Sequence, residues 1–300
     1  MDPNRDKMAM SPGYRLELEI CEDKRPDTAI GVLLPVPPTT PDQELKRLTL
    51  DRSWSVAPCH TRDEAQSALF VTCPDSTLNR PITLEMSTCG RLMEEHFTQS
   101  PAADAMPGDD AQQLFSALCL GETASEDERL LRIIDCLSRK FRYRSGFDNQ
   151  EPLTCDALTG NCFSINTAVI RLAHLARIQT AYYIGFFFEQ CDPLVADDWH
   201  CWVSTLTTRG FESWDIAHHL KRALQPISPA LNPIPGIRFA MSVGHDLAFR
   251  LACGTVRVPR LCEPRWIFPD GRSRACRVRV TATPLSVMAD IPAPSTVPTM

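Results

Sequence analysis

Strict alternation of apolar and charged residues marks the first element of the chain. In residues 14–20 (YRLELEI), every second side chain is apolar and those between are charged. Side chains of a strand point alternately to its two faces, so this pattern predicts a strand with one buried face. Further apolar segments with β character lie at residues 29–36, 68–73 and 82–88. We therefore expect an antiparallel β domain over residues 1–100, with residues 1–12 disordered.

A helical period replaces the alternation further along the chain. In residues 126–143 (EDERLLRIIDCLSRKFRY), apolar positions recur every three to four residues between an acidic start and a basic end. These charges complement the helix dipole, so the segment predicts an amphipathic helix, which we expect to end near residues 145–146. A second apolar stripe starts at Cys162 and continues to Ala176, which predicts a helix that begins at this cysteine.

The β pattern then returns. Residues 180–189 (TAYYIGFFFE) predict a strand, and residues 199–217 (WHCWVSTLTTRGFESWDIA) predict a hairpin that turns about Thr207 and Thr208. Two later segments, residues 236–251 and 273–284, also have β character. Strands before and after a pair of helices indicate an α+β fold.

Composition places the boundaries between units. Residues 100–112 (SPAADAMPGDDAQ) are rich in Pro, Ala, Gly and Asp and lack an apolar period, so we expect a connection over residues 101–113. Residues 114–285 then form a second unit, whose last part is a C-terminal β extension. The Pro-, Ser- and Thr-rich residues 286–300 predict a disordered tail.

Charge and cysteine usage exclude several classes of protein. The chain has 31 basic and 37 acidic residues and a formal net charge of −6, which argues against general nucleic-acid binding. We find no signal peptide and no run of about 18 apolar residues, so we expect a cytoplasmic protein without a membrane span. The 13 cysteines are odd in number and scattered, which favours reduced thiols over a disulfide framework. Their spacing fits no structural zinc site, and we expect neither a metal nor a cofactor.

Cys162 is the candidate nucleophile. At the first turn of a helix, a cysteine faces unpaired backbone N–H groups and the positive end of the helix dipole, which favour the thiolate. If the hairpin turns about Thr207 and Thr208, the numbers of any two residues that face each other across it add up to 415. His200 then lies opposite Asp215 on the neighbouring strand. A carboxylate in that place would orient the imidazole. The predicted catalytic residues are Cys162, His200 and Asp215.

The other histidines are weaker candidates. His174 lies twelve positions after Cys162 on the same helix, about 18 Å along its axis, which is too far to activate the thiol. His218 and His219 follow the aspartate in a segment that we expect to be exposed, and His245 we interpret as structural.

Two motifs also carry a family resemblance. The segment CDALTGNCFSINTAVIRLAHLARIQTAYYIGF, followed by HCWVSTLTTRGFESWDIA, resembles the cysteine and histidine segments of the transglutaminase-like superfamily. The resemblance implies a papain-like core in which the helix bearing Cys162 packs on an antiparallel sheet, with His200 as base and Asp215 as its orienting group. The preceding β unit is similar to the N-terminal domain of many bacterial members. No calcium-loop pattern such as D-x-D-x-D-G occurs, so calcium dependence is not expected.

The resemblance implies acyl transfer from an amide or thioester donor through a cysteine acyl-enzyme. Three hypotheses remain: transfer to an amine, which forms an amide; transfer to water, as in a cysteine peptidase or amidase; and a catalytically silent binding or scaffold module. An intact Cys, His and Asp set argues against the third.

An arginine-rich segment favours the first hypothesis. Residues 250–279 hold eight arginines against two acidic residues, Glu263 and Asp270. Such a segment is either a solvated strand face or a docking surface for an acidic partner. An acidic acyl carrier protein would suit the docking surface, because it could deliver a thioester donor. The acyl donor, the acceptor and the oligomeric state are not specified by the sequence.

Overall fold

The computed structural model describes most of the chain. The described residues are 13–22, 26–62, 65–72, 81–97, 106, 108–118, 124–144, 153–154, 158–196, 199–224, 226–229 and 234–285. The two ends that were expected to be disordered, residues 1–12 and 286–300, lie outside them. Within these residues, no helix has the length and apolar content that crossing a bilayer requires.

The first strand follows its predicted alternation. In β1 (Gly13–Ile20), Leu16, Leu18 and Ile20 are buried and the charged residues between them are exposed. This strand lies inside an antiparallel five-stranded sheet of order β10-β18-β1-β6-β3. The other members are β3 (Glu44–Thr49), β6 (Ile82–Ser87), β10 (Leu194–Ala196) and β18 (Val278–Leu285).

A second five-stranded sheet has the order β17-β16-β2-β5-β4. Its strands are β2 (Gly31–Pro35), β4 (Ser55–His60), β5 (Ser67–Thr72), β16 (Arg265–Ile267) and β17 (Ser273–Ala275), and a separate hairpin holds β14 (Leu247–Leu251) and β15 (Gly254–Val258). Strands β16 and β18 pair directly with β2 and β1. The β extension after the catalytic segment therefore completes the sheets that the N-terminal strands begin.

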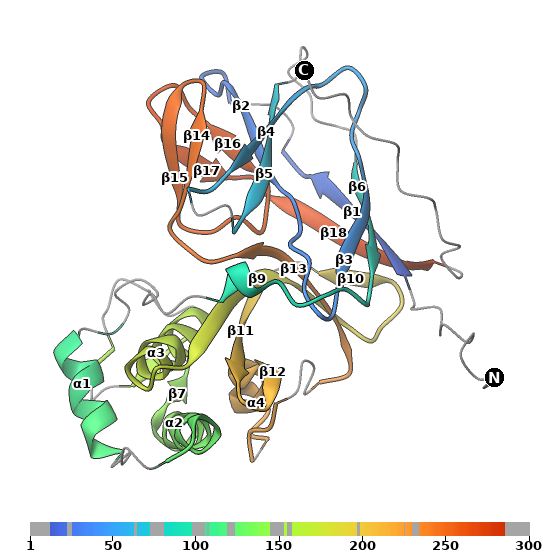
Figure 1. Ribbon diagram of the computed structural model, residues 1–300. Coiled ribbons are helices and arrows are strands. Elements are labelled where there is room, and N and C mark those ends of the chain that lie inside the picture. The colour runs from blue at the N-terminus through green and yellow to red at the C-terminus, as the bar shows by residue number, and fades with distance from the viewer. Residues whose placement is uncertain are drawn as a thin grey trace, which may run out of the picture.

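The third sheet carries the candidate site. It is antiparallel, has the order β12-β11-β9-β13, and consists of β9 (Gln179–Glu189), β11 (Trp199–Thr207), β12 (Gly210–Trp214) and β13 (Gly236–Val243). Helix α3 (Cys162–Leu175) packs against β9 and β11. Figure 1 shows the helices gathered at one end of the molecule and the two five-stranded sheets at the other, with β9 and β13 between them.

The remaining elements are short or helical. They are α1 (Gly108–Ala117), α2 (Glu126–Lys140), α4 (Ile216–Lys221), the 3-10 turn η1 (Glu94–His96) and the short parallel pair β7 (Arg142–Tyr143) and β8 (Thr159–Gly160). Four of them, α1, α2, α4 and β8, contact α3. Ser125 caps α2, and its hydroxyl and the Glu128 side chain form a reciprocal capping box.

Two boundaries from the sequence need correction. Residues 108–113, which we placed in the irregular connection, belong to α1, where Ala111 and Leu114 are buried at helical spacing. Helix α2 ends at Lys140 rather than near residues 145–146, because Phe141 adopts an extended conformation (φ −78°, ψ 131°) and leads into β7. Residues 145 and 146 themselves lie outside the described part.

Two glutamine side chains attach the N-terminal sheets to β13. Gln43 donates Nε2 to the carbonyl of Ala240 (2.9 Å) and accepts the Ala240 N–H at Oε1 (2.7 Å). Gln66 accepts the Val243 N–H at Oε1 (2.8 Å). Because β13 lies at the edge of its sheet, these side chains replace the missing neighbour strand and fix the sheet that carries the site.

Candidate active site

The turn before α3 is built around the cysteine. A Cβ added at Gly160 would lie 2.4 Å from the Ser164 side chain, so only glycine lets the chain pass this close to the first helical turn. Asn161 caps the helix, and its Oδ1 accepts the N–H groups of Phe163 (2.9 Å) and Ser164 (3.3 Å). Cys162 is thus the first helical residue, as predicted, and is 8% exposed.

The structure corrects the register of the hairpin. Thr207 pairs with Gly210 and Val203 with Trp214, so paired numbers sum to 417 instead of 415 and the turn lies at residues 208–209. Strand β12 ends at Trp214, and Asp215 caps α4 instead of pairing with His200 in a ladder. Because the error is two residues, each side chain stays on its predicted face, and His200 still reaches Asp215.

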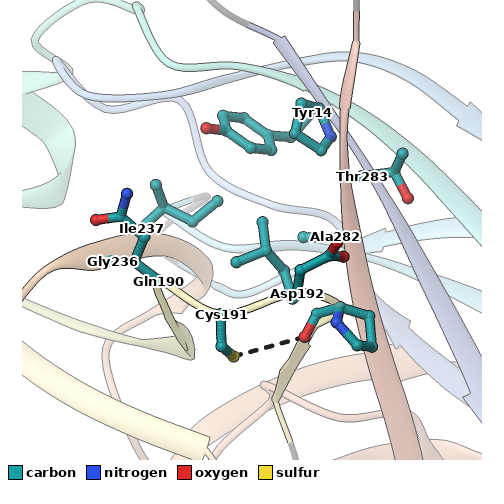
Figure 2. Close-up of a pocket in the computed structure, with 11 residues that line it drawn as sticks. Tyr14, Gln190, Cys191, Asp192, Gly236, Ile237, Ala282 and Thr283 are labelled. Atoms are coloured by element: carbon teal, nitrogen blue, oxygen red, sulfur yellow. Dashed lines mark hydrogen bonds between the residues drawn. The ribbon is translucent and has the colours of Figure 1, made fainter.

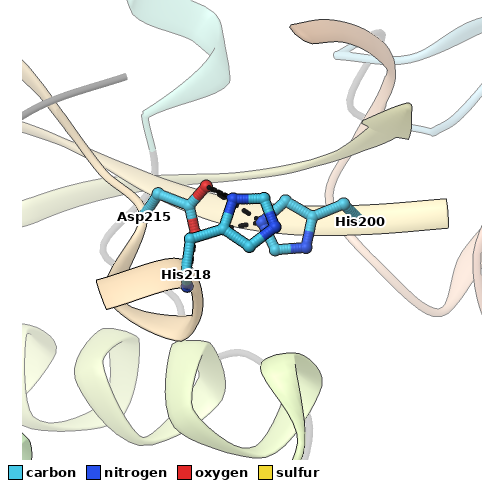
Figure 3. Close-up of side chains that lie close together, drawn as sticks. All are labelled: His200, Asp215 and His218. Carbon is cyan, nitrogen blue, oxygen red and sulfur yellow. Dashed lines mark hydrogen bonds and ion pairs between the residues drawn. The ribbon is translucent and has the colours of Figure 1, made fainter. Parts of the chain in front are cut away.

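The Asp215 carboxylate is the centre of the site, and it is fully buried. His200 directs Nε2 to both of its oxygens, at 2.9 and 3.0 Å. Arg238 of β13 donates Nη1 to Oδ2 at 2.7 Å, and His218 places Nδ1 2.8 Å from the same oxygen. Figure 3 shows His218 on the turn of α4 and His200 on β11 approaching Asp215 together.

The expectation that His218 and His219 are exposed is wrong. They are 6% and 4% exposed, because the first turn of α4 packs inward. The His218 ring lies parallel to that of His200, with centroids 4.0 Å apart and planes at 5°. Phe187 contacts the His218 ring edge-on at 4.6 Å. His218 therefore supports both the carboxylate and the imidazole that the carboxylate orients.

Cys162 and His200 form a charged pair. Their side chains hydrogen-bond, and since Nε2 of His200 faces Asp215, Nδ1 is the nitrogen left for the thiol. Burial alone would lower the pKa of His200, but the Asp215 carboxylate and the Cys162 thiol raise it to about 9. A hydrogen bond from Cys201, together with His200, holds the pKa of Cys162 well below its usual range despite burial. At neutral pH the site therefore holds a thiolate and an imidazolium.

The charges around Asp215 balance. Burial would raise the pKa of Asp215, but His200, His218 and Arg238 hold it well below its usual range. Burial lowers the pKa of Arg238 to about 10, which leaves the guanidinium charged at neutral pH. Burial also lowers the pKa of His218, so this ring is neutral. Two positive groups, His200 and Arg238, thus compensate two negative ones, Cys162 and Asp215.

Three side chains here could in principle ligate a metal. Ligand atoms of His200, Asp215 and His218 lie within 4.8 Å of one another. However, Arg238 already places a positive charge 2.7 Å from the carboxylate. A divalent cation among these atoms would meet that charge and the imidazolium of His200, so the arrangement favours the acid–base role over a metal role.

Two cavities are lined by residues other than Cys162, His200 and Asp215. The larger one, about 710 Å³, opens between the ends of β9 and β13 and strands β1 and β18, and Figure 2 shows Tyr14, Cys191 and Ile237 on its walls. No triad residue lines it. A second cavity of about 440 Å³ reaches His245, whose ring contacts that of Phe163, the residue after Cys162, at 6.1 Å.

The arginine-rich segment does not form one face. Carboxylates neutralise four of its arginines: Glu263 pairs with Arg260 and Arg265, Asp270 with Arg272, and Glu22 with Arg274. Among the described residues, no carboxylate is within ion-pair distance of the other four, Arg250, Arg257, Arg277 and Arg279, all of which are exposed. Arg250 and Arg257 lie diagonally opposite each other on the β14–β15 hairpin, whereas Arg277 directly precedes β18 and Arg279 lies near its start. Any docking surface is therefore smaller than the sequence indicated.

Sequence reasoning missed Arg238, His218 and Cys201. Arg238 lies 23 residues after Asp215, on β13, at a position that pairs with Phe187 of β9. His218 was considered and rejected, although its spacing of three from Asp215 at the start of a helix was a usable signal. Cys201 follows His200 directly, and only the position of α3 reveals that it meets Cys162.

Comparison with known proteins adds information on the fold. No family model matches the chain, and no curated protein matches it. A solved structure of a candidate cysteine protease from Cytophaga hutchinsonii covers 93% of this chain and 92% of its own, with a TM-score of 0.56 at 13% identity. The periplasmic domain of TgpA from Pseudomonas aeruginosa aligns over 73% of this chain and 92% of its own, with a TM-score of 0.37 at 14% identity. At this identity, the first likeness shows a shared fold over nearly the whole of both chains.

Proposed function

We propose that this protein is a transglutaminase-like, papain-like cysteine enzyme that transfers acyl groups through a thioester on Cys162. The observation that carries the proposal is the buried chain of Cys162 thiolate, His200 imidazolium and Asp215 carboxylate. Groups of this kind perform nucleophilic and general acid–base catalysis on carbonyl compounds. A binding module would gain nothing from three buried charges held in this order, so the scaffold hypothesis has less support.

The reaction begins when Cys162 Sγ attacks the carbonyl carbon of an amide or thioester. The carbonyl oxygen then carries the negative charge, and the backbone N–H of Cys162, which Asn161 does not cap, is a suitable donor to it. His200 gives its proton to the departing amine or thiol as the carbon–heteroatom bond breaks. The acyl-enzyme remains, with His200 neutral and ready to accept a proton.

The second half-reaction decides the product. An acceptor gives a proton to His200 and attacks the acyl carbon, and Cys162 leaves as the thiolate. We favour an amine as acceptor, which makes the enzyme an amide-forming acyltransferase. Hydrolysis is the second candidate, because the full-length structural likeness is to a candidate cysteine protease.

We also propose that an acidic acyl carrier protein delivers the acyl donor, and that it docks on a smaller surface than the whole arginine-rich segment. Arg250 and Arg257 are exposed on the β14–β15 hairpin, which begins two residues after His245. The cavity at His245 extends along the same hairpin to Leu247 and Ala248. Reversing both charges should raise the KM for a carrier-bound donor and leave that for a small thioester unchanged.

Incubation with a carrier-bound acyl thioester and a primary amine tests the proposal. We expect mass spectrometry to find an adduct on Cys162 that partitions to amide, and the Cys162→Ala protein to form neither. Peptide cleavage with thioesters ignored would establish the hydrolase. The absence of any adduct with amide and thioester donors would support the scaffold hypothesis.

A further inference from the structure

A second thiol lies against the candidate nucleophile. Cys201 follows His200 on β11, is fully buried, and hydrogen-bonds to Cys162. Neither cysteine is part of a disulfide in this structure. The acyl-transfer steps proposed above involve Cys162 and His200 and need no sulfur at position 201. A serine there could supply the hydrogen bond that Cys201 gives to the Cys162 thiolate, so the presence of a sulfur calls for another explanation.

The surrounding structure keeps the two sulfur atoms together. Asn166 lies four residues, about one helical turn, after Cys162. Its Nδ2 donates to the carbonyl of Cys201 at 2.9 Å and to Sγ of Cys201 at 3.3 Å. This amide joins the first turns of α3 to β11 at the cysteine itself. The hydrogen bond between Cys162 and Cys201 brings the two sulfur atoms into contact, and a disulfide forms when they reach about 2.05 Å.

The two thiols differ in reactivity. Cys162 is held as a thiolate by Cys201 and His200, and a thiolate is the form that hydroperoxides oxidise. Burial raises the pKa of Cys201, so Cys201 stays a thiol and is not itself the first target of a hydroperoxide. Cys262 is also buried, but it donates its thiol hydrogen to Glu263.

We propose that Cys162 and Cys201 form a redox couple, in which Cys201 resolves an oxidised Cys162 into an intramolecular disulfide. A hydroperoxide gives its terminal oxygen to the Cys162 thiolate and leaves as water or an alcohol after taking up a proton, and Cys162 becomes a sulfenic acid. The Cys201 sulfur then attacks the Cys162 sulfur. The S–S bond forms, the S–O bond breaks, and hydroxide leaves with the proton of Cys201 as water.

The disulfide has two consequences. It removes the nucleophile, so the enzyme is inactive while oxidised, and it shields Cys162 from irreversible oxidation to the sulfinic acid. A dithiol reductant restores both thiols by exchange. The inference rests on the thiolate of the proposed function, but not on any acyl donor, so it can be tested without a substrate.

The experiment exposes the reduced full-length protein to hydrogen peroxide, alkylates the remaining thiols and maps the digest by mass spectrometry. Cys155 and Cys162 share the tryptic peptide between Arg144 and Arg171, so tandem spectra or a Cys155→Ser background must separate them. We expect loss of two free thiols, a Cys162–Cys201 cross-link, and full reversal by dithiothreitol.

Replacing Cys201 shows what peroxide does to Cys162 when no second sulfur can form the disulfide. In Cys201→Ser, which keeps a hydrogen-bond donor beside the thiolate, peroxide should take Cys162 to the sulfinic acid, which dithiothreitol does not reverse. Circular dichroism confirms that the variant is folded. The exposed Cys191→Ser serves as the matched control and should cross-link like the wild type. Two results overturn the proposal: equal sulfinic acid yields in wild type and Cys201→Ser, or a cross-link that joins Cys162 to another cysteine. Failure of acyl transfer together with an intact cross-link would instead refute only the proposed function.

Discussion

Replacing Asp215 by asparagine tests whether the carboxylate holds His200 in its charged form. The pKa of His200 rises from 6.5 to about 9 in the fold, which corresponds to about 3 kcal/mol in favour of the imidazolium. Burial alone would lower the pKa of His200, so the free energy by which Asp215 and Cys162 together favour the imidazolium is larger than this net value. Without the carboxylate charge, we expect the pKa of His200 to fall well below 9, because burial lowers it and only Cys162 still raises it.

The substitution is mild for the backbone. Asp215 caps α4 by accepting the N–H of His218, and asparagine is an equally good cap. The assay is an NMR titration of histidine ring protons, with the His200 signal assigned from His200→Gln. Asp270→Asn, at an exposed ion pair, is the matched control and should leave the His200 titration near 9.

The same titration can refute the reasoning. A His200 pKa that stays near 9 in Asp215→Asn would mean that the thiolate alone holds the proton on the imidazole. The aspartate would then be a structural cap of α4 and no member of the catalytic chain. A fall in the Asp270→Asn control would mean that the titration reports the overall charge of the protein.

Three further predictions concern activity and stability. In a plot of kcat/KM against pH, the value should fall in acid as the depressed pKa of Cys162 is crossed. It should fall again above about 9, where His200 loses the proton that the leaving group needs. A kcat/KM that stays constant through pH 9 would exclude His200 as the general acid. His200→Ala and Asp215→Ala should each reduce kcat, and the double variant should be no worse than His200→Ala, whereas additive losses would show that Asp215 acts elsewhere. Gln43→Ala should reduce the free energy of unfolding by about 2–4 kcal/mol because it leaves buried backbone groups of β13 unpaired; chemical denaturation should show no such loss for the exposed Gln190→Ala.

Local signals in the sequence predicted the elements that carry the nucleophile. Helix α3 begins at Cys162 because Asn161 caps it and an apolar stripe follows, and both features lie within one segment of the chain. Strand β1 followed from alternation alone. The pairing of β18 with β1 joins residues that are far apart in the chain, and their alternation is satisfied by any sheet, so periodicity could not predict it.

The residues around Asp215 were harder to predict, because most of them also come from parts of the chain that are distant in sequence. The estimated hairpin register was wrong by two residues, and it still placed His200 near Asp215 because side-chain direction repeats every two residues. Arg238 reaches the carboxylate from β13, beyond a segment that carries no regular pattern. His218 depended on whether α4 packs inward, which is a property of the tertiary fold.

Competition among the cysteines for iodoacetamide tests the central claim most directly. Cys89, Cys191 and Cys253 are exposed, whereas Cys162 is 8% exposed, so access alone would favour the surface thiols. If Cys162 is a thiolate paired with His200, brief treatment at neutral pH with peptide mapping should find Cys162 alkylated first, and His200→Ala should remove that preference. Alkylation of the three exposed cysteines before Cys162 would contradict the thiolate–imidazolium pair on which the proposed function depends.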